Sequence, residues 1–97
     1  MEKLQDDELR WLLRDLDGWQ PLADAIHREF TFPGFGEAIA FVNRVATIAT
    51  DAGHHPDLEI HYNRVVVSLS THDAGGVTQR DIDLASRIDT VTDPADA

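Results

Sequence analysis

Three histidines and one aspartate are the residues of this 97-residue chain best suited to chemistry. His54 and His55 are adjacent, His72 follows in a later segment, and Asp81 stands near the predicted start of the last helix. Because imidazole has an ordinary pKa of about 6.5, it can give or take a proton at neutral pH. The chain therefore has suitable side chains for general acid/base catalysis, if the fold brings them together.

The position of the histidine pair supports this interpretation. Apolar residues between Phe35 and Ala52 recur at three- and four-residue intervals, and Gly53 follows them directly. This pattern predicts a long helix that ends with a glycine cap. The unpaired carbonyl groups at a helix C-terminus favour an imidazolium ion, so His54 is the better placed of the pair to act as a general acid.

Structural explanations compete with the functional ones. His27 and His61 have no such context, and His61 alternates with apolar neighbours as a surface residue of a strand does. The segment from Thr78 to Asp81 resembles a helix capping box with Asp in place of the usual Glu or Gln. Asp81 could therefore cap a helix, support a histidine, or do both.

Other kinds of site fit the sequence less well. Adjacent side chains of an extended segment point in opposite directions, so His54 and His55 seldom reach one metal ion, and no metal is predicted. A serine hydrolase is not expected, because Ser68 and Ser70 lie in a predicted strand without a nucleophile-elbow motif. Two glycines at Gly75-Gly76 are too few for a phosphate-binding loop.

Composition narrows the function further. The formal net charge is -10, from 18 acidic against 8 basic residues, which opposes direct binding to nucleic acid or to an anionic membrane surface. Cysteine is absent, which excludes disulfides and thiolate sites and fits a reducing compartment. The N-terminus does not resemble a signal peptide, and no apolar run reaches the roughly 18 residues of a membrane span. We expect a cytoplasmic protein.

The length and patterning predict one domain over residues 1–97, with a frayed tail at 93–97. The first predicted element is a helix with Asp6 or Asp7 as its N-cap, which stops by Gly18. The predicted elements that follow are a hairpin of 19–22 and 25–32, a helix over 35–52, a second hairpin of 58–62 and 65–71 that turns at Asn63-Arg64, and a helix over 78–91. Two hairpins that each lead into a helix indicate an α+β fold, a two-layer sandwich with a four-stranded antiparallel sheet and about three helices on one face.

The run from Val65 to Val67 is apolar on both faces of its strand, which favours burial of a sheet surface or edge by self-association.

Four segments of the chain closely resemble the pterin-4a-carbinolamine dehydratase family. They are Gly53-His54-His55-Pro56-Asp57, Tyr62-Asn63-Arg64-Val65, the run from Leu69 to Thr78, and Arg80-Asp81-Ile82 with Leu84-Ala85. Their order and spacing agree with the family pattern. The N-terminal half agrees more loosely, through Gly18-Trp19 and through Phe30 and Phe32, so the resemblance covers nearly the whole domain.

The resemblance implies dehydration of 4a-hydroxytetrahydropterin to quinonoid dihydropterin, with no metal or nucleotide cofactor. It also implies a role in recycling the pterin used by aromatic amino-acid hydroxylases, and assembly as a homodimer or homotetramer. By the family pattern, His54 and His72 match the acid/base histidines, His55 the histidine that binds the pterin, and Asp81 the acid that supports a histidine. Positions that line the family pocket match Trp19, Ser70 and Thr71.

One position departs from the family pattern. Four residues before the histidine pair the family usually has an acid, whereas this chain has Thr50, with Asp51 one place later. On a helix that shift rotates the carboxylate by about 100 degrees. This departure, with the second role of some eukaryotic members as dimerisation cofactors of a transcription factor, motivates an alternative: a catalytically weak pterin-binding or protein-interaction module on the same fold.

Overall fold

A computed structural model describes residues 1–92 of the chain, and the tail predicted to be frayed lies outside them. Its elements, in chain order, are α1 (Asp6–Leu13), β1 (Gln20–Leu22), β2 (Ala25–Thr31), α2 (Phe35–Ala52), β3 (Asp57–His61), β4 (Arg64–Leu69), the short 3-10 helix η1 (His72–Ala74) and α3 (Gln79–Asp89). This sequence of elements follows the predicted order of two hairpins that each lead into a helix.

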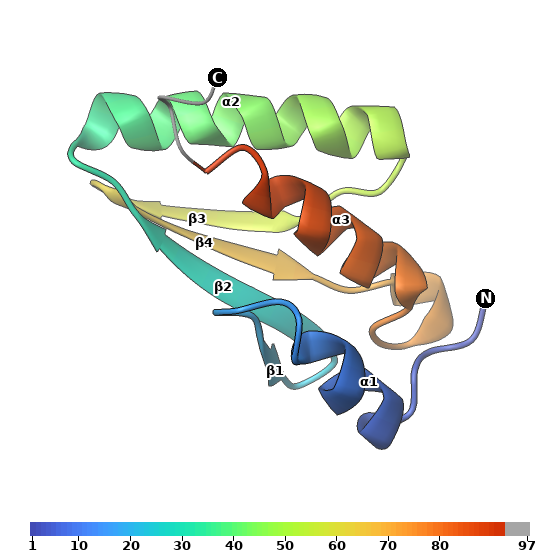
Figure 1. The fold of residues 1–97 in the computed structure, drawn as a ribbon. Coiled ribbons are helices and arrows are strands. Elements are labelled where there is room, and N and C mark those ends of the chain that lie inside the picture. The colour runs from blue at the N-terminus through green and yellow to red at the C-terminus, as the bar shows by residue number, and fades with distance from the viewer. Residues whose placement is uncertain (93–97) are drawn as a thin grey trace.

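The four strands form one antiparallel sheet in the order β1-β2-β4-β3. The two hairpins meet where β2 pairs with β4, with Phe30 opposite Val65 and Ile26 opposite Leu69. The long helix α2 and the C-terminal helix α3 lie on the same side of the sheet, as Figure 1 shows. The predicted α+β fold with a four-stranded antiparallel sheet is thereby confirmed.

The core lies between the sheet and these two helices. Alternate residues of β4 point toward the helices, and Val65, Val67 and Leu69 are fully buried there. Phe41 of α2 lies at the centre, with its ring 4.7 Å from that of Phe30 and 5.0 Å from that of Phe32. The burial of these side chains fixes α2 against the sheet and so fixes the position of the end of α2.

The valine run of β4 behaves differently on its two faces. Val65 and Val67 are buried under the helices, whereas Val66 is half-buried on the open face. Its neighbours across the two strand pairs are Glu29 and Glu59. This row of the open face is therefore mainly charged on both sides of Val66. Self-association through a sheet surface or a strand edge stays a prediction.

Some boundaries also differ from those predicted. Helix α1 is capped by Gln5, whose backbone N–H donates to the Glu8 side chain, so neither Asp6 nor Asp7 is the cap. Helix α1 ends at Leu13, and turns lead from there to Gly18, whose backbone φ is +87°. The β3–β4 turn begins one residue before the prediction, at Tyr62 with φ +55°, and Arg64 already belongs to β4.

Replacing Phe41 with Ala should lower the free energy of unfolding by about 3–5 kcal/mol, because it opens a cavity among packed aromatic rings. The same change at Phe35, which is 52% exposed, is the matched control and should cost less than about 1 kcal/mol. Chemical denaturation followed by circular dichroism measures both. Equal losses at the two positions would contradict the placement of Phe41 at the centre of the core.

Candidate active site

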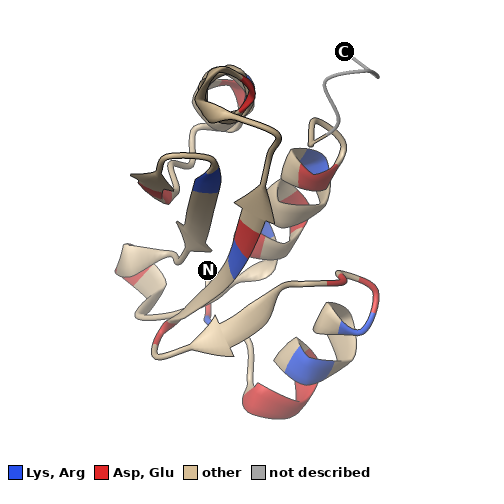
Figure 2. Ribbon diagram, turned by 90° about the vertical axis from the view of Figure 1, so that its left-hand side faces the viewer, with Lys and Arg blue, Asp and Glu red and all other residues tan. Residues whose placement is uncertain are grey.

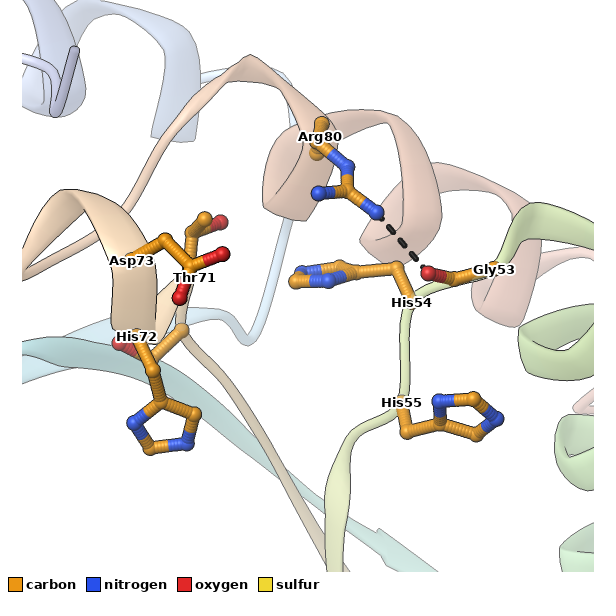
Figure 3. A pocket seen from close by; sticks show the side chains of 8 residues that line it. Gly53, His54, His55, Thr71, His72, Asp73 and Arg80 are labelled. Atoms are coloured by element: carbon orange, nitrogen blue, oxygen red, sulfur yellow. Dashed lines mark hydrogen bonds between the residues drawn. The ribbon is translucent and has the colours of Figure 1, made fainter. Parts of the chain in front are cut away.

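The site is a cavity of about 300 Å³ where the end of α2, the end of β4 and the start of α3 meet. Figure 3 shows the residues that line it: Gly53, His54, His55, Ser70, Thr71, His72, Asp73 and Arg80. The fold therefore brings all three predicted histidines to one cavity, although 18 positions separate His54 from His72 in the sequence.

His54 owes its position to the way α2 ends. Gly53 adopts a left-handed backbone with φ +65°, a conformation that favours glycine, and its N–H donates to carbonyl groups of the last helical turn. The N–H of His54 then donates to the carbonyl of Ala49. From α3, Arg80 Nη2 donates to the Gly53 carbonyl at 2.9 Å, which ties the start of α3 to the residue before His54.

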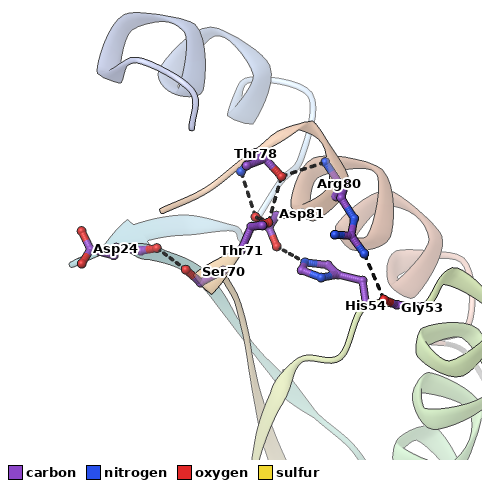
Figure 4. Close-up of polar contacts among 8 residues, drawn as sticks. All are labelled: Asp24, Gly53, His54, Ser70, Thr71, Thr78, Arg80 and Asp81. Carbon is purple, nitrogen blue, oxygen red and sulfur yellow. Dashed lines mark hydrogen bonds and ion pairs between the residues drawn. The ribbon is translucent and has the colours of Figure 1, made fainter. Parts of the chain in front are cut away.

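The His54 ring contacts a buried carboxylate. Its Nε2 lies 2.5 Å from Oδ1 of Asp81, which is fully buried, while His54 itself is 9% exposed. The other carboxylate oxygen, Oδ2, accepts hydrogen bonds from the Thr71 hydroxyl at 2.9 Å and from the Thr78 backbone N–H at 2.8 Å. Figure 4 shows these contacts converging on Asp81. Both oxygens of this buried acid are therefore occupied.

Asp81 consequently has the two roles that its sequence position allows. As the third residue of α3 it accepts the backbone N–H of Thr78, and the Thr78 hydroxyl in turn accepts the N–H of Arg80, so the predicted capping box is present. Its other oxygen holds the His54 ring. A buried carboxylate against an imidazole fixes the orientation of the ring.

The other two histidines are more open. His55 and His72 are exposed, and His72 belongs to the short helix η1 on the opposite wall from His54. Figure 3 shows their rings separated from each other and from the His54 ring. Across residues 1–92, no three His, Asp or Glu side chains gather closely enough to hold a metal ion. The three imidazoles thus face the cavity as separate groups that can each contact a bound molecule.

The three predicted substrate-binding residues are placed differently. Thr71 and Ser70 line the cavity, although the Ser70 hydroxyl also donates to the Asp24 carbonyl at 2.7 Å. Trp19 does not line it. The indole is 3% exposed, and its Nε1 donates to both carboxylate oxygens of Asp89 at 3.0 and 3.1 Å. The position of Trp19 in the core does not support a contact with substrate.

Arg80 and Asp73 line the cavity but were not among the predicted site residues. Asp73 directly follows His72 and Arg80 directly precedes Asp81, yet a lone charge on a surface helix or loop is usually only solvated. Arg80 brings a fixed positive charge beside the histidines, in a protein whose formal net charge is -10. Figure 2 shows that acidic segments are instead distributed over all three α-helices.

The departure from the family pattern lies outside the cavity wall. Thr50 and Asp51 are both exposed in the last turn of α2, and neither is among the residues that line the cavity. In this structure neither position 50 nor position 51 therefore contributes to the lining of the cavity.

The fold and this cavity define a small α+β domain with a cavity lined by three histidines. Residues 2–91 match the family model described as pterin 4 alpha carbinolamine dehydratase. A curated relative from Thermomicrobium roseum, named provisionally as a pterin-4-alpha-carbinolamine dehydratase, is 50% identical over 88 residues, which cover 91% of this chain and 95% of the relative. This chain belongs to the pterin-4-alpha-carbinolamine dehydratase family.

Solved structures agree with the family assignment. A transcriptional coactivator/pterin dehydratase from Brucella melitensis superposes with a TM-score of 0.91 at 38% identity, over 95% of this chain and all of that one. A pterin dehydratase-like protein identified as a RuBisCO assembly factor superposes with a TM-score of 0.64 over 76% of this chain and 86% of that one. At 19% identity, the second comparison supports the fold alone. No helix within residues 1–92 combines the length and apolar character of a membrane span.

Replacing Gly53 with Ala should lower the free energy of unfolding by about 1–2 kcal/mol, because a side chain disfavours the left-handed backbone. A Cβ at Gly53 would meet no atom within 4 Å, so backbone strain is the only cost. Gly36 is the matched control, since a Cβ there also meets nothing and the residue lies in α2. Its replacement with Ala should stabilise the protein by about 0.4–1 kcal/mol. Denaturant titration would contradict this account if both changes shifted stability in the same direction.

Proposed function

We propose that the protein catalyses dehydration of 4a-hydroxytetrahydropterin to quinonoid dihydropterin by histidine acid/base catalysis. The observation that carries the proposal is the His54–Asp81 pair in the wall of a cavity that His55 and His72 also line. Family membership supports the choice of substrate class. The physiological context that follows is pterin recycling for aromatic amino-acid hydroxylation in the cytoplasm, by a homodimer or homotetramer.

The reaction requires two proton transfers and no redox change. The N5–H bond of the substrate breaks, and its electron pair forms the C=N bond between N5 and C4a. The C4a–O bond breaks toward oxygen as the C=N bond forms, and this oxygen accepts a proton and leaves as water. One group must take the N5 proton and another must supply a proton to the hydroxyl, so a pair of imidazoles in opposite protonation states is sufficient.

The cavity residues fit these roles. His54 and His72 are assigned to the two proton transfers, because they lie on opposite walls of the cavity, and Asp81 supports the His54 ring. His55 and Thr71 are assigned to binding the pterin, together with Ser70. Bound solvent on the two catalytic imidazoles can return each to its starting protonation state after turnover. No metal, nucleotide or other cofactor takes part in this scheme.

Thr50 supports a second candidate function, that of a pterin-binding or protein-interaction module. The carboxylate that the family usually has at this position is missing, and the exposed Asp51 does not reach the cavity wall. A protein with the same cavity could bind pterin with little turnover and act through protein contacts instead. Pterin binding without acceleration of the dehydration would favour this alternative.

Stopped-flow absorbance on freshly generated 4a-hydroxytetrahydropterin tests the enzymatic function. Micromolar protein should accelerate the dehydration above its spontaneous rate. Replacing either His54 or His72 with Ala should lower kcat by about 10²- to 10⁴-fold, the usual contribution of a positioned acid or base.

His61→Ala is the matched control, because His61 is exposed at the end of β3 and contacts only Glu59 among the polar side chains of residues 1–92. Its kcat should equal that of the unmodified protein. No acceleration by the unmodified protein would exclude the dehydratase function. Equal losses in all three variants would instead remove the assignment of the two catalytic histidines.

A further inference from the structure

The direction of each hydrogen bond around Asp81 follows from a count of protons. The Thr78 hydroxyl accepts the backbone N–H of Arg80 at 3.2 Å, and the Thr71 hydroxyl donates its only proton to Asp81 Oδ2 at 2.9 Å. The two hydroxyl oxygens are 2.9 Å apart. Because the Thr71 proton is already in use, Thr78 must donate to Thr71. This series of hydrogen bonds therefore runs in one direction, from Thr78 through Thr71 to Asp81 (Figure 4).

The same count determines the proton position on His54. Asp81 Oδ2 receives two donors, the Thr71 hydroxyl and the Thr78 N–H, and Oδ1 faces His54 Nε2. An ionised carboxylate has no proton to donate, so Nε2 must carry the hydrogen of this contact. A neutral imidazole then has a bare Nδ1. Within residues 1–92, Nδ1 of His54 has no hydrogen-bond partner, while the ring lines the cavity wall.

We propose that the Asp81 carboxylate, held in one orientation by Thr71 and Thr78, keeps His54 in the Nε2–H tautomer and so makes Nδ1 the nitrogen that exchanges a proton with substrate. Thr78 is then a positioning residue that does not line the cavity and acts through Thr71 and Asp81. This proposal deepens the proposed function and rests on it for the identity of the substrate, whereas the tautomer can be measured without any substrate.

Asp81→Asn gives the clearest change, because an amide has one accepting and one donating end. The Thr71 hydroxyl and the Thr78 N–H both require an acceptor, so they should hold the amide oxygen at the Oδ2 position. The NH₂ group would then face His54 and donate to Nε2. The neutral ring should consequently switch to the Nδ1–H tautomer, with Nδ1 no longer able to accept a proton.

Nuclear magnetic resonance of the full chain, with histidine labelled with nitrogen-15, measures these tautomers at a pH where the imidazoles are neutral. Loss of a signal in His54→Gln identifies the His54 ring. We expect the Nε2–H form in the unmodified protein and the Nδ1–H form in Asp81→Asn. An Nδ1–H form in the unmodified protein, or an unchanged tautomer in Asp81→Asn, would overturn the proposal.

Thr78→Val and Thr78→Ser test the positioning role of the hydroxyl. Valine removes both the donor to Thr71 and the acceptor for Arg80, so the Asp81 carboxylate and the His54 ring should be held less rigidly, whereas serine should keep the original geometry. The Nε2–H tautomer should persist in both variants, because the carboxylate still only accepts hydrogen bonds. In the dehydration assay kcat of Thr78→Val should fall about tenfold, equivalent to about 1.4 kcal/mol, with little change in KM, and Thr78→Ser should keep the original kcat. A kcat of Thr78→Val equal to that of the unmodified protein would remove Thr78 from the proposal.

A stability control separates positioning from general loosening of α3. Ile82 is buried in the same helix and its apolar side chain makes no hydrogen bond, so Ile82→Val should weaken packing without changing the tautomer or kcat. A fall of kcat in Ile82→Val equal to that in Thr78→Val would count against a specific role for the hydroxyl. Absence of dehydratase activity in the unmodified protein would reject the proposed function, while its His54 tautomer would still decide the hydrogen-bond proposal.

Discussion

The contact between Asp81 and His54 is the interaction on which the site depends. A carboxylate removed from water costs several kcal/mol unless its oxygens are paired with donors. Here the donors come from three parts of the chain: the residue that follows α2, the residues after β4, and the cap of α3. Satisfying one buried acid therefore requires all three segments to meet, and the cavity forms at their junction.

This arrangement links the stability of the fold to the position of the His54 ring in the cavity. Asp81 caps α3 with one oxygen and holds the His54 ring with the other, so a displacement of α3 also displaces this ring. Arg80 adds a second connection through the Gly53 carbonyl. The aromatic cluster around Phe41 fixes the position of α2, because it holds this helix against the sheet. Rigid placement of the histidine thus follows from packing more than from the cavity itself.

The cavity also differs electrostatically from the rest of the molecule. Three imidazoles and the Arg80 guanidinium line it, against the single carboxylate of Asp73, although the whole chain carries a formal net charge of -10. A cavity with several hydrogen-bond donors suits a heteroaromatic molecule rich in carbonyl and ring-nitrogen acceptors. The acidic surface outside the cavity disfavours association with polyanions. The charged groups in the cavity and those on the surface therefore have different effects.

The sequence by itself determined the order of elements, the α+β class and the histidines that share the cavity. Hydrophobic periodicity and the glycine cap are local signals, and the motif around His54, His72 and Asp81 has a spacing that can be compared directly with a family. The neighbours of other side chains depend on long-range packing, which the sequence does not show. Trp19 is a predicted site residue, and the tertiary structure places its indole against Asp89, 70 positions away in the chain. Val66 belongs to a predicted apolar surface, and its neighbours across the sheet are glutamates. Only the tertiary structure decided that Asp81 is buried against His54, because that contact joins residues 27 positions apart and depends on where α2 and α3 cross the sheet.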